Sequence, residues 1–388
     1  MSNSFGPWTT AITMSSPKGL GTFWKRRLSM LLPISRTSPG LSRRAVVGIA
    51  AAGFLACLLP NFRLAPVCAQ PQQGRDDLKS KARIYVNVKL RYKPEGKDKE
   101  ERRDQLVIAI DPDTGKWQKI GDNGIVSIPD NGRVSPDRQT LAFSENQETW
   151  ICDTHGTKLP RRISDKIGEL IWSPDGKRLV ATKSEWPNPH HLKAETWRID
   201  ADGSNPVRLP IPDTDSVEDW SPDGQWFVTC SDRHPPHARG YQLYVMKTDG
   251  SQQRRLTEGG LNCNARFSPD GRKILYLHQT HKEGNSIWVV DADGKNAREI
   301  VKTIGVAGHA ARLVDPQAGV LDSAFWSPDG KQIAVVLLDW KKGMVLMRDA
   351  EQANFRIEIM DVDGKNRREL KLADAKFVYI FGHGSDWR

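Results

Sequence analysis

One short turn sequence recurs along most of the chain, and it limits the fold more than any other feature. Ser-Pro-Asp occurs five times, and four copies continue to Gly and follow an aromatic residue. The copies begin at Ser135, Ser173, Ser221, Ser268 and Ser327. Pro fixes φ at the second turn position, Asp bonds back to the backbone, and Gly accepts a positive φ, so the motif predicts a tight turn. The apolar, β-rich run after each copy predicts a strand.

A second element alternates with these turns and predicts a β-hairpin each time. It consists of a strand, a turn rich in Asp and Gly, and a second strand. Its six copies read IAIDPDTGKWQKI, WICDTHGTKLPRRI, WRIDADGSNPVRLP, LYVMKTDGSQQRRL, WVVDADGKNAREI and IEIMDVDGKNRREL. Successive Ser-Pro-Asp turns are 38 to 59 residues apart. Four antiparallel strands in a repeat of this size are typical of a β-propeller blade.

The count of the two elements predicts how the ring closes. Six hairpins and five Ser-Pro-Asp turns leave the first blade without an inner strand, although strands are expected at 84–92, 105–111 and 117–120. Near the C-terminus, Ser385-Asp386-Trp387 resembles Glu218-Asp219-Trp220, which precedes a Ser-Pro-Asp turn. We therefore expect an all-β, six-bladed β-propeller over residues 82–388, closed by a C-terminal strand that completes the first blade.

The N-terminal segment predicts export. Residues 1–69 contain eight basic residues and no acidic residue, and residues 45–59 are apolar without interruption. Fifteen apolar residues suit a signal peptide better than a spanning helix, which needs about 20. Ser42-Arg43-Arg44 resembles a twin-arginine signal, and ordinary secretory export is the alternative. We expect cleavage after Ala69, a linker over residues 70–81, and a periplasmic or secreted protein; an uncleaved leader would be its link to a membrane.

Charge and cysteine content exclude two classes of function. The formal charge of +10 falls to +2 when the eight basic residues of the leader are subtracted, leaving 49 basic against 47 acidic residues. The propeller has no basic stripe, so nucleic acid is not an expected partner. Cys152, Cys230 and Cys263 form no C-x-x-C pair, which argues against a zinc site and a disulfide framework.

The W-S-P-D-G turn followed by D-x-D-G resembles the TolB-type, WD-like propeller repeat, over about residues 82–388. The resemblance implies a periplasmic binding role, because TolB binds a peptidoglycan-associated lipoprotein. Similar propellers stand beside the hydrolase domain of prolyl-oligopeptidase-like enzymes and in oligogalacturonate lyases. TolB carries an α/β domain before its propeller, and residues 70–81 leave no room for one, so its partners are not implied here.

Histidines are the candidate site residues, because no G-x-S-x-G, H-E-x-x-H or phosphate-loop motif occurs. In each blade the tight turns lie at one end, and the long loops and the links between blades lie at the other. Eight of the nine histidines map to this long-loop rim. The expected binding residues are His190, His191, His234, His237, His281, Trp186, Arg239 and Asp219.

Two functions are compatible with this pattern. The first is a monomeric scaffold without a cofactor that binds an envelope protein or a carbohydrate and is not an enzyme. The alternative is a metal-dependent, carbohydrate-active enzyme resembling the oligogalacturonate lyases. It requires His190, His234 and His281 to converge on one divalent ion, since imidazole is a common metal ligand. Long polar loops can also collect histidines that share no ligand.

Overall fold

The computed structural model describes the propeller in twelve stretches of chain. These are residues 81–92, 102–121, 132–145, 148–165, 168–188, 191–233, 241–280, 284–302, 320–339, 354–372, 377–379 and 386–388. Within them the regular structure consists of strands. No helix in these stretches is long and apolar enough to span a membrane. The expected leader, residues 1–69, and all but the last residue of the expected linker, residues 70–81, lie outside the described residues.

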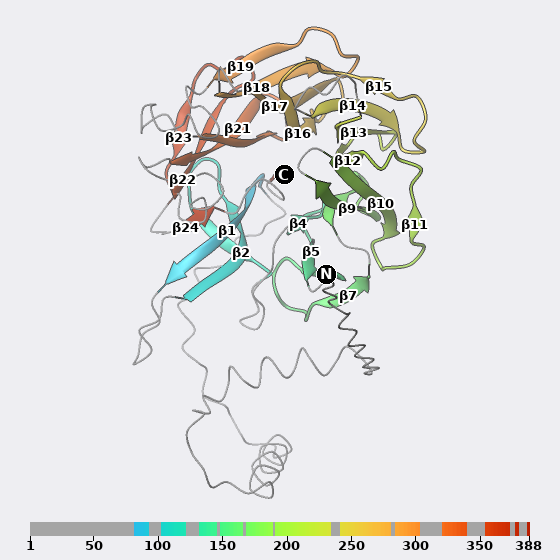
Figure 1. The fold of residues 1–388 in the computed structure, drawn as a ribbon. Coiled ribbons are helices and arrows are strands. Elements are labelled where there is room, and N and C mark those ends of the chain that lie inside the picture. The colour runs from blue at the N-terminus through green and yellow to red at the C-terminus, as the bar shows by residue number, and fades with distance from the viewer. Residues whose placement is uncertain are drawn as a thin grey trace, which may run out of the picture. The chain divides into compact units, whose positions relative to one another are not determined.

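Six antiparallel sheets form six blades around an axis, as Figure 1 shows from along that axis. Blade 1 contains β1 (Ile84–Tyr92), β2 (Arg102–Ile110) and β3 (Trp117–Ile120). Blade 2 contains β4 (Arg133–Val134), β5 (Thr140–Glu145), β6 (Glu148–Asp153) and β7 (Arg161–Ser164). Blade 3 contains β8 (Glu169–Trp172), β9 (Arg178–Asn188), β10 (His191–Asp200) and β11 (Val207–Arg208).

The other three blades repeat the same order. Blade 4 contains β12 (Asp215–Trp220), β13 (Trp226–Ser231), β14 (Gln242–Lys247) and β15 (Arg254–Arg255). Blade 5 contains β16 (Leu261–Phe267), β17 (Lys273–Thr280), β18 (Gly284–Asp291) and β19 (Arg298–Lys302). Blade 6 contains β20 (Val320–Trp326), β21 (Gln332–Asp339), β22 (Asn354–Asp361) and β23 (Arg368–Leu370). The predicted all-β, six-bladed propeller is thus confirmed.

The C-terminal segment completes blade 1, as predicted. β24 (Phe377–Tyr379) and β25 (Asp386–Trp387) both pair antiparallel with β1. In this register Trp387 faces Ile84, and the backbones of Arg83 and Arg388 exchange two hydrogen bonds of 2.6 and 2.9 Å. The C-terminus therefore lies near the centre of the ring, where the inner strands meet (Figure 1).

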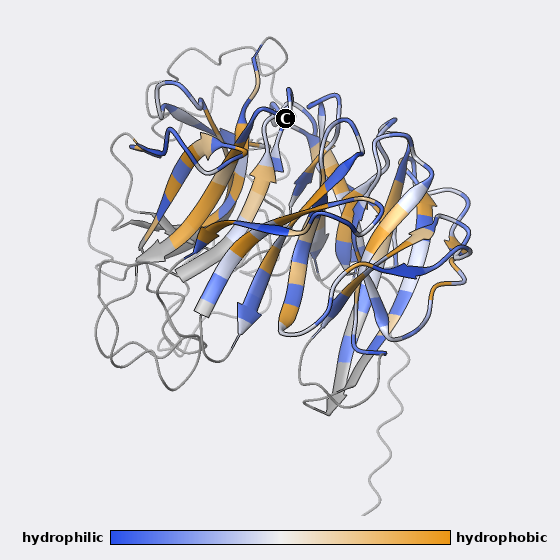
Figure 2. Ribbon diagram, turned by 90° about the horizontal axis from the view of Figure 1, so that it is seen from above, coloured by the Kyte–Doolittle hydropathy of each residue, from blue (hydrophilic) through white to orange (hydrophobic). Residues whose placement is uncertain are grey.

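The hydrophobic core lies between the blades, and the strand pattern explains why. Alternate side chains of a strand point to opposite faces of its sheet, so a strand with both faces covered is apolar on both. Six buried clusters occur in the described stretches, one for each pair of neighbouring blades. The cluster between blades 6 and 1 includes Phe325, Ile84 and Trp387. In Figure 2 the hydrophobic residues follow the strands, and hydrophilic residues mark the turns.

The Ser-Pro-Asp turns are held by their own side chains. In blade 3, Ser173 Oγ donates to Asp175 Oδ1 over 2.6 Å, and Asp175 Oδ1 accepts the backbone N–H of Lys177 over 3.0 Å. Gly176 closes the turn at φ +69°. The same bonds recur in blades 4, 5 and 6. In blade 2 the glycine position holds Arg138, which adopts φ +62°.

Hydrogen bonds from outer strands to hairpin turns link neighbouring blades. Among the described residues, an arginine of an outer strand donates to a turn carbonyl of the following blade at four interfaces: Arg161 to Ala201 and Asp202, Arg254 to Ala292, Arg298 to Val362 and Arg368 to Pro112. Gly203 shows how closely the blades approach. A Cβ atom there would lie 2.3 Å from the carbonyl oxygen of Ile163, so only glycine fits this turn.

Candidate binding site at the channel and its rim

Most of the residues predicted from the sequence to bind a ligand lie outside the described stretches: His190, His234, His237, His281 and Arg239. Trp186 lies in β9 and His191 in β10. These strands pair as far as Asn188 and His191, so most of the segment that the sequence predicts as the long loop of blade 3 forms a long β-hairpin instead. Among the described residues no group of three or more His, Cys, Asp or Glu is arranged to hold a metal ion. The convergence of His190, His234 and His281 therefore stays a prediction.

Asp219 lies on the inner strand of blade 4, next to the tight-turn end of the channel. It directly precedes Trp220 and the Ser-Pro-Asp-Gly turn. Its Oδ2 accepts the backbone N–H of Phe267, in blade 5, over 2.8 Å. In return, Arg266 Nη1 of blade 5 donates to the carbonyl oxygen of Glu218 over 2.7 Å. Asp219 thus joins two inner strands.

The position of Asp219 is charged in four of the six blades. The residue directly before the end of the inner strand is Asp386 in blade 1, Arg133 in blade 2, Asp219 in blade 4 and Arg266 in blade 5. Blades 3 and 6 have apolar residues there. Around the ring, each blade with an arginine at this position therefore comes directly after a blade with an aspartate there. Blades 2 and 5 stand opposite one another in a ring of six, so this arrangement repeats across the channel.

The charges of these side chains meet across the channel. Burial, followed by repulsion from Arg266, lowers the pKa of Arg133 to about 10, although Asp386 and Asp219 oppose the shift. Burial raises the pKa of Asp219, and Arg266 opposes it. Burial would also raise the pKa of Asp386, but Arg388, Arg266 and Arg133 together hold this pKa below its ordinary value. Charges of both signs therefore converge at the tight-turn end of the channel.

The opposite end of blade 4 carries a second polar group. Asp215 begins β12, pairs with Ser231 and is fully buried. Its Oδ2 accepts the hydroxyl of Thr229 over 3.0 Å and lies 3.6 Å from Arg233 Nη2. Burial raises the pKa of Asp215, while the hydrogen bond from Ser231 and the charge of Arg233 oppose the shift. Arg233 also lies 3.9 Å above the ring of Tyr244, at the point where the long loop of blade 4 begins.

A hydrogen-bonded network joins blades 4 and 5 at the same end. His278 Nδ1 lies 2.7 Å from Asn262 Oδ1, and Asn262 Nδ2 donates to Gln242 Oε1 over 3.0 Å. The imidazole of His278 packs against Trp288 with ring centroids 5.3 Å apart. The ring of His278 is thus positioned by two side chains of blade 5, and Gln242 of blade 4 in turn holds Asn262.

A family model described as the TolB beta propeller domain matches residues 85–305, which is more than half of the chain. The chain belongs to the TolB β-propeller domain family. An uncharacterised protein of Agrobacterium fabrum is 28% identical over 250 residues, covering 61% of this chain and 73% of that protein. The Tol-Pal system protein TolB of Zymomonas mobilis is 39% identical over 62 residues, 16% of this chain and 14% of that protein.

The fold of this TolB-type propeller also matches solved structures. TolB from Acinetobacter baumannii superposes with a TM-score of 0.54 at 19% identity, over 78% of this chain and 66% of that one. The chain therefore spans less than two thirds of that TolB structure and a small part of the curated TolB sequence. At this identity the likeness shows the fold alone.

Sequence reasoning predicted Asp219 as a binding residue but missed Arg133, Arg266 and Asp386, and it also missed the buried Asp215. The sequence contained a signal for the channel charges, because Arg133, Asp219, Arg266 and Asp386 occupy one position of the aligned TolB-type repeat. The packing of the blades decides which side chains of an inner strand face the channel, and the repeat pattern alone does not reveal this. Asp215 gave no signal, since its partners Thr229 and Arg233 come from other parts of the blade.

Proposed function

We propose that the mature chain is a binding scaffold of the cell envelope, which holds a protein or carbohydrate ligand at the long-loop face of its propeller. The observation that carries this proposal is the convergence of Arg133, Asp219, Arg266 and Asp386 at the tight-turn end of the channel. Because these charged side chains gather at the tight-turn end, we place the entrance for a ligand at the long-loop end. A ligand that reached the channel would enter there.

The side chains at the two ends of the blades support the same choice of face. At the tight-turn end, the aspartates of the Ser-Pro-Asp-Gly motifs accept hydrogen bonds within their own turns, as Asp175 does. At the long-loop end, Arg233 lies against Tyr244 beside the start of a long loop. Arginine and tyrosine often anchor protein interfaces, and loops on a rigid scaffold commonly carry binding residues.

The envelope location rests on the N-terminal segment and on the family. The apolar run over residues 45–59 has the length of a signal peptide, and curated relatives include Tol-Pal system proteins. Expression of the full chain with a C-terminal tag, followed by cell fractionation and N-terminal sequencing, tests the location. We expect a periplasmic or secreted product that begins at Gln70. Membrane-bound material that retains residues 45–59 would instead establish an uncleaved anchor.

Affinity capture from the native envelope fraction tests the binding face. We expect Arg233→Ala to reduce the capture of a specific partner and Asp329→Asn, in the tight turn of blade 6, to leave it unchanged. Thermal unfolding of both variants checks that they remain folded. If the tight-turn variant abolishes capture while Arg233→Ala does not, the assignment of the binding face is reversed.

A further inference from the structure

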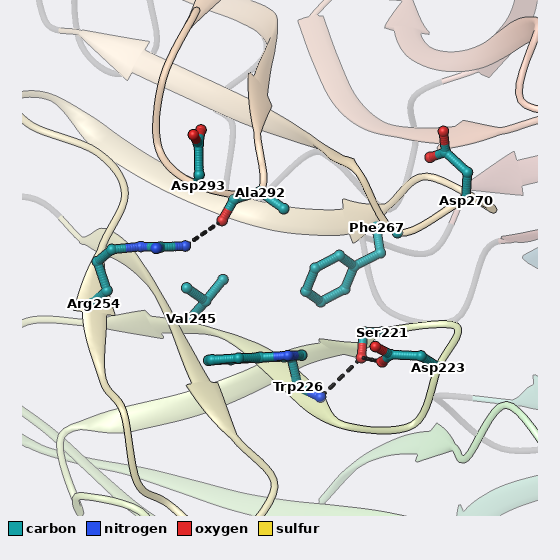
Figure 3. Close-up of a pocket in the computed structure, with 10 residues that line it drawn as sticks. Ser221, Asp223, Trp226, Val245, Arg254, Phe267, Asp270, Ala292 and Asp293 are labelled. Carbon is teal, nitrogen blue, oxygen red and sulfur yellow. Dashed lines mark hydrogen bonds between the residues drawn. The ribbon is translucent and has the colours of Figure 1, made fainter.

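A slot opens between blades 4 and 5 on the tight-turn side, on the face opposite the proposed binding face. It encloses about 320 Å³, near the lower limit of the roughly 300–1,000 Å³ typical of ligand pockets. Trp226 and Val245 of blade 4 and Phe267 of blade 5 form its apolar walls. In Figure 3 the bond between Arg254 and the carbonyl oxygen of Ala292 lies at one end of the slot, and Asp223 and Asp270 lie at the other.

The slot coincides with a departure of blade 4 from the repeat. In blade 3, Arg178 pairs across the sheet with Asp200, and their charged atoms are 3.6 Å apart. In blade 5, Lys273 pairs with Asp291 over 2.5 Å. At the same register blade 4 has Trp226 opposite Lys247.

Trp226 thus occupies the position at which blades 3 and 5 have a basic residue that forms an ion pair with an aspartate of the same blade. Blade 6 has a polar residue at this position, Gln332, which donates to Asp361. Among these four blades, only blade 4 presents an aromatic face here. Trp226 is half-buried, so part of its ring stays accessible from the slot.

The charge at the rim of the slot is negative. The Ser268 hydroxyl and the Arg272 N–H hold the pKa of Asp270 below its ordinary value, so this carboxyl is ionised at neutral pH. Both Asp223 and Asp270 use Oδ1 to hold their own turns, which leaves Oδ2 of each for a ligand. A third carboxylate of the lining, Asp293, already pairs with Lys295 over 3.2 Å.

We propose that this slot binds an arginine side chain of a partner protein. The apolar stem of the arginine would lie between Trp226 and Phe267, and its guanidinium would reach Asp223 and Asp270. A planar guanidinium stacks on aromatic rings and bonds to carboxylates in a fixed geometry, so it suits an indole wall with two carboxylates at one end. Arg254 at the far end repels the cation and sets the direction in which the ligand enters.

A titration with N-acetyl-arginine amide tests the proposal on the purified protein. The indole N–H signals are followed by NMR after ¹⁵N labelling of tryptophan, and Trp226→Phe identifies the signal of Trp226. We expect this signal to shift and to saturate with the arginine probe. N-acetyl-citrulline amide, which has the same shape without the charge, is expected to bind about tenfold more weakly because it loses a charge-assisted hydrogen bond.

Variants of the repeated turns provide a matched control. The double variant Asp223→Asn and Asp270→Asn is expected to weaken binding of the arginine probe about tenfold, because the amide oxygen can still hold the turn while the charge is lost. The equivalent pair Asp175→Asn and Asp329→Asn changes the same turns in blades 3 and 6 and is expected to leave binding unchanged.

Three outcomes would overturn the arginine site. They are equal affinity for the citrulline probe, an equal loss of binding in both double variants, and an unshifted Trp226 signal at saturating probe. The citrulline comparison uses the wild-type protein and so stands even if a variant does not fold. Because this slot is on the opposite face, its failure and that of the long-loop site are distinguishable.

Discussion

Removal of the last three residues should open the ring between blades 6 and 1. Trp387 is 7% exposed and packs in the cluster shared by these blades. Loss of a buried Trp side chain costs about 3–5 kcal/mol, and each of the two backbone hydrogen bonds between Arg83 and Arg388 adds about 0.5–1.5 kcal/mol. The sum, about 4–8 kcal/mol, is comparable with the whole stability of a typical domain, about 5–15 kcal/mol.

Thermal unfolding followed by circular dichroism measures this loss. We expect a chain that ends at Ser385 to be unfolded or strongly destabilised, and Trp387→Ala to lower Tm by on the order of 10 °C. Leu159→Ala is the control, because that side chain is 67% exposed and its removal should change Tm little. A truncated chain that melts with the parent would refute the pairing of β25 with β1.

A circular permutant provides the converse test. Arg388 N donates to Arg83 O over 2.9 Å, just as Ser221 N donates to Trp226 O over 2.8 Å across the turn of blade 4. The four residues Pro-Asp-Gly-Gln separate Ser221 from Trp226. A permutant that starts at residue 132 and joins Arg388 to Arg83 through these four residues should therefore fold with a Tm at least that of the parent.

Three other changes test the turns, the channel and the rim. Gly203→Ala should destabilise the fold by more than Gly259→Ala in urea unfolding, because a Cβ at Gly203 meets a carbonyl oxygen of blade 2, whereas at Gly259, also at positive φ, it meets empty space. Asp386→Asn should lower Tm at pH 7. Since the folded pKa of Asp386 is below its unfolded value, the carboxylate stabilises the fold above the unfolded pKa, and the difference in Tm should vanish as pH falls through the folded pKa. The last change concerns the long-loop rim. If the protein is a scaffold, elemental analysis of the dialysed protein should find no stoichiometric divalent metal. One ion per chain that is lost on His234→Ala would instead favour the metal-dependent enzyme.

The blades, the turns and the closure could be predicted because they depend on local chemistry. A Ser-Pro-Asp-Gly turn satisfies its own hydrogen bonds, as at Ser173 and Asp175, and its sequence therefore reports its structure wherever it occurs. The closing strand followed from comparing the repeats, since Asp386-Trp387 matches Asp219-Trp220 of blade 4. The predicted second strand of blade 1 was 105–111, and β2 spans Arg102–Ile110.

The site was less predictable, because its residues come together only through the closed ring. Arg133 and Arg266 are far apart in sequence and on opposite blades, yet the charge of one lowers the pKa of the other. No spacing rule within a single repeat indicates this proximity. For the rim histidines the opposite holds. Their position in the repeat predicts the face on which they lie, but the conformation of the long loops decides whether they are close enough to share a ligand.

The positions at which one blade differs from the others are the positions at which this propeller can bind a specific ligand. A residue that is identical in five blades, such as the aspartate of the Ser-Pro-Asp turn, does the same structural work in each of them. A residue that differs in one blade either weakens that blade or has a role outside the structure of the blade. Trp226 replaces a cation that is paired in blades 3 and 5, and its half-buried ring packs against the core between blades 4 and 5 while it also lines the slot. Lys247 replaces the partner carboxylate at the same register, so neither member of the ion pair remains in blade 4. This double replacement removes the ion pair, keeps β13 paired with β14, and places an indole ring on the wall of the slot, which is why we assign the slot a ligand.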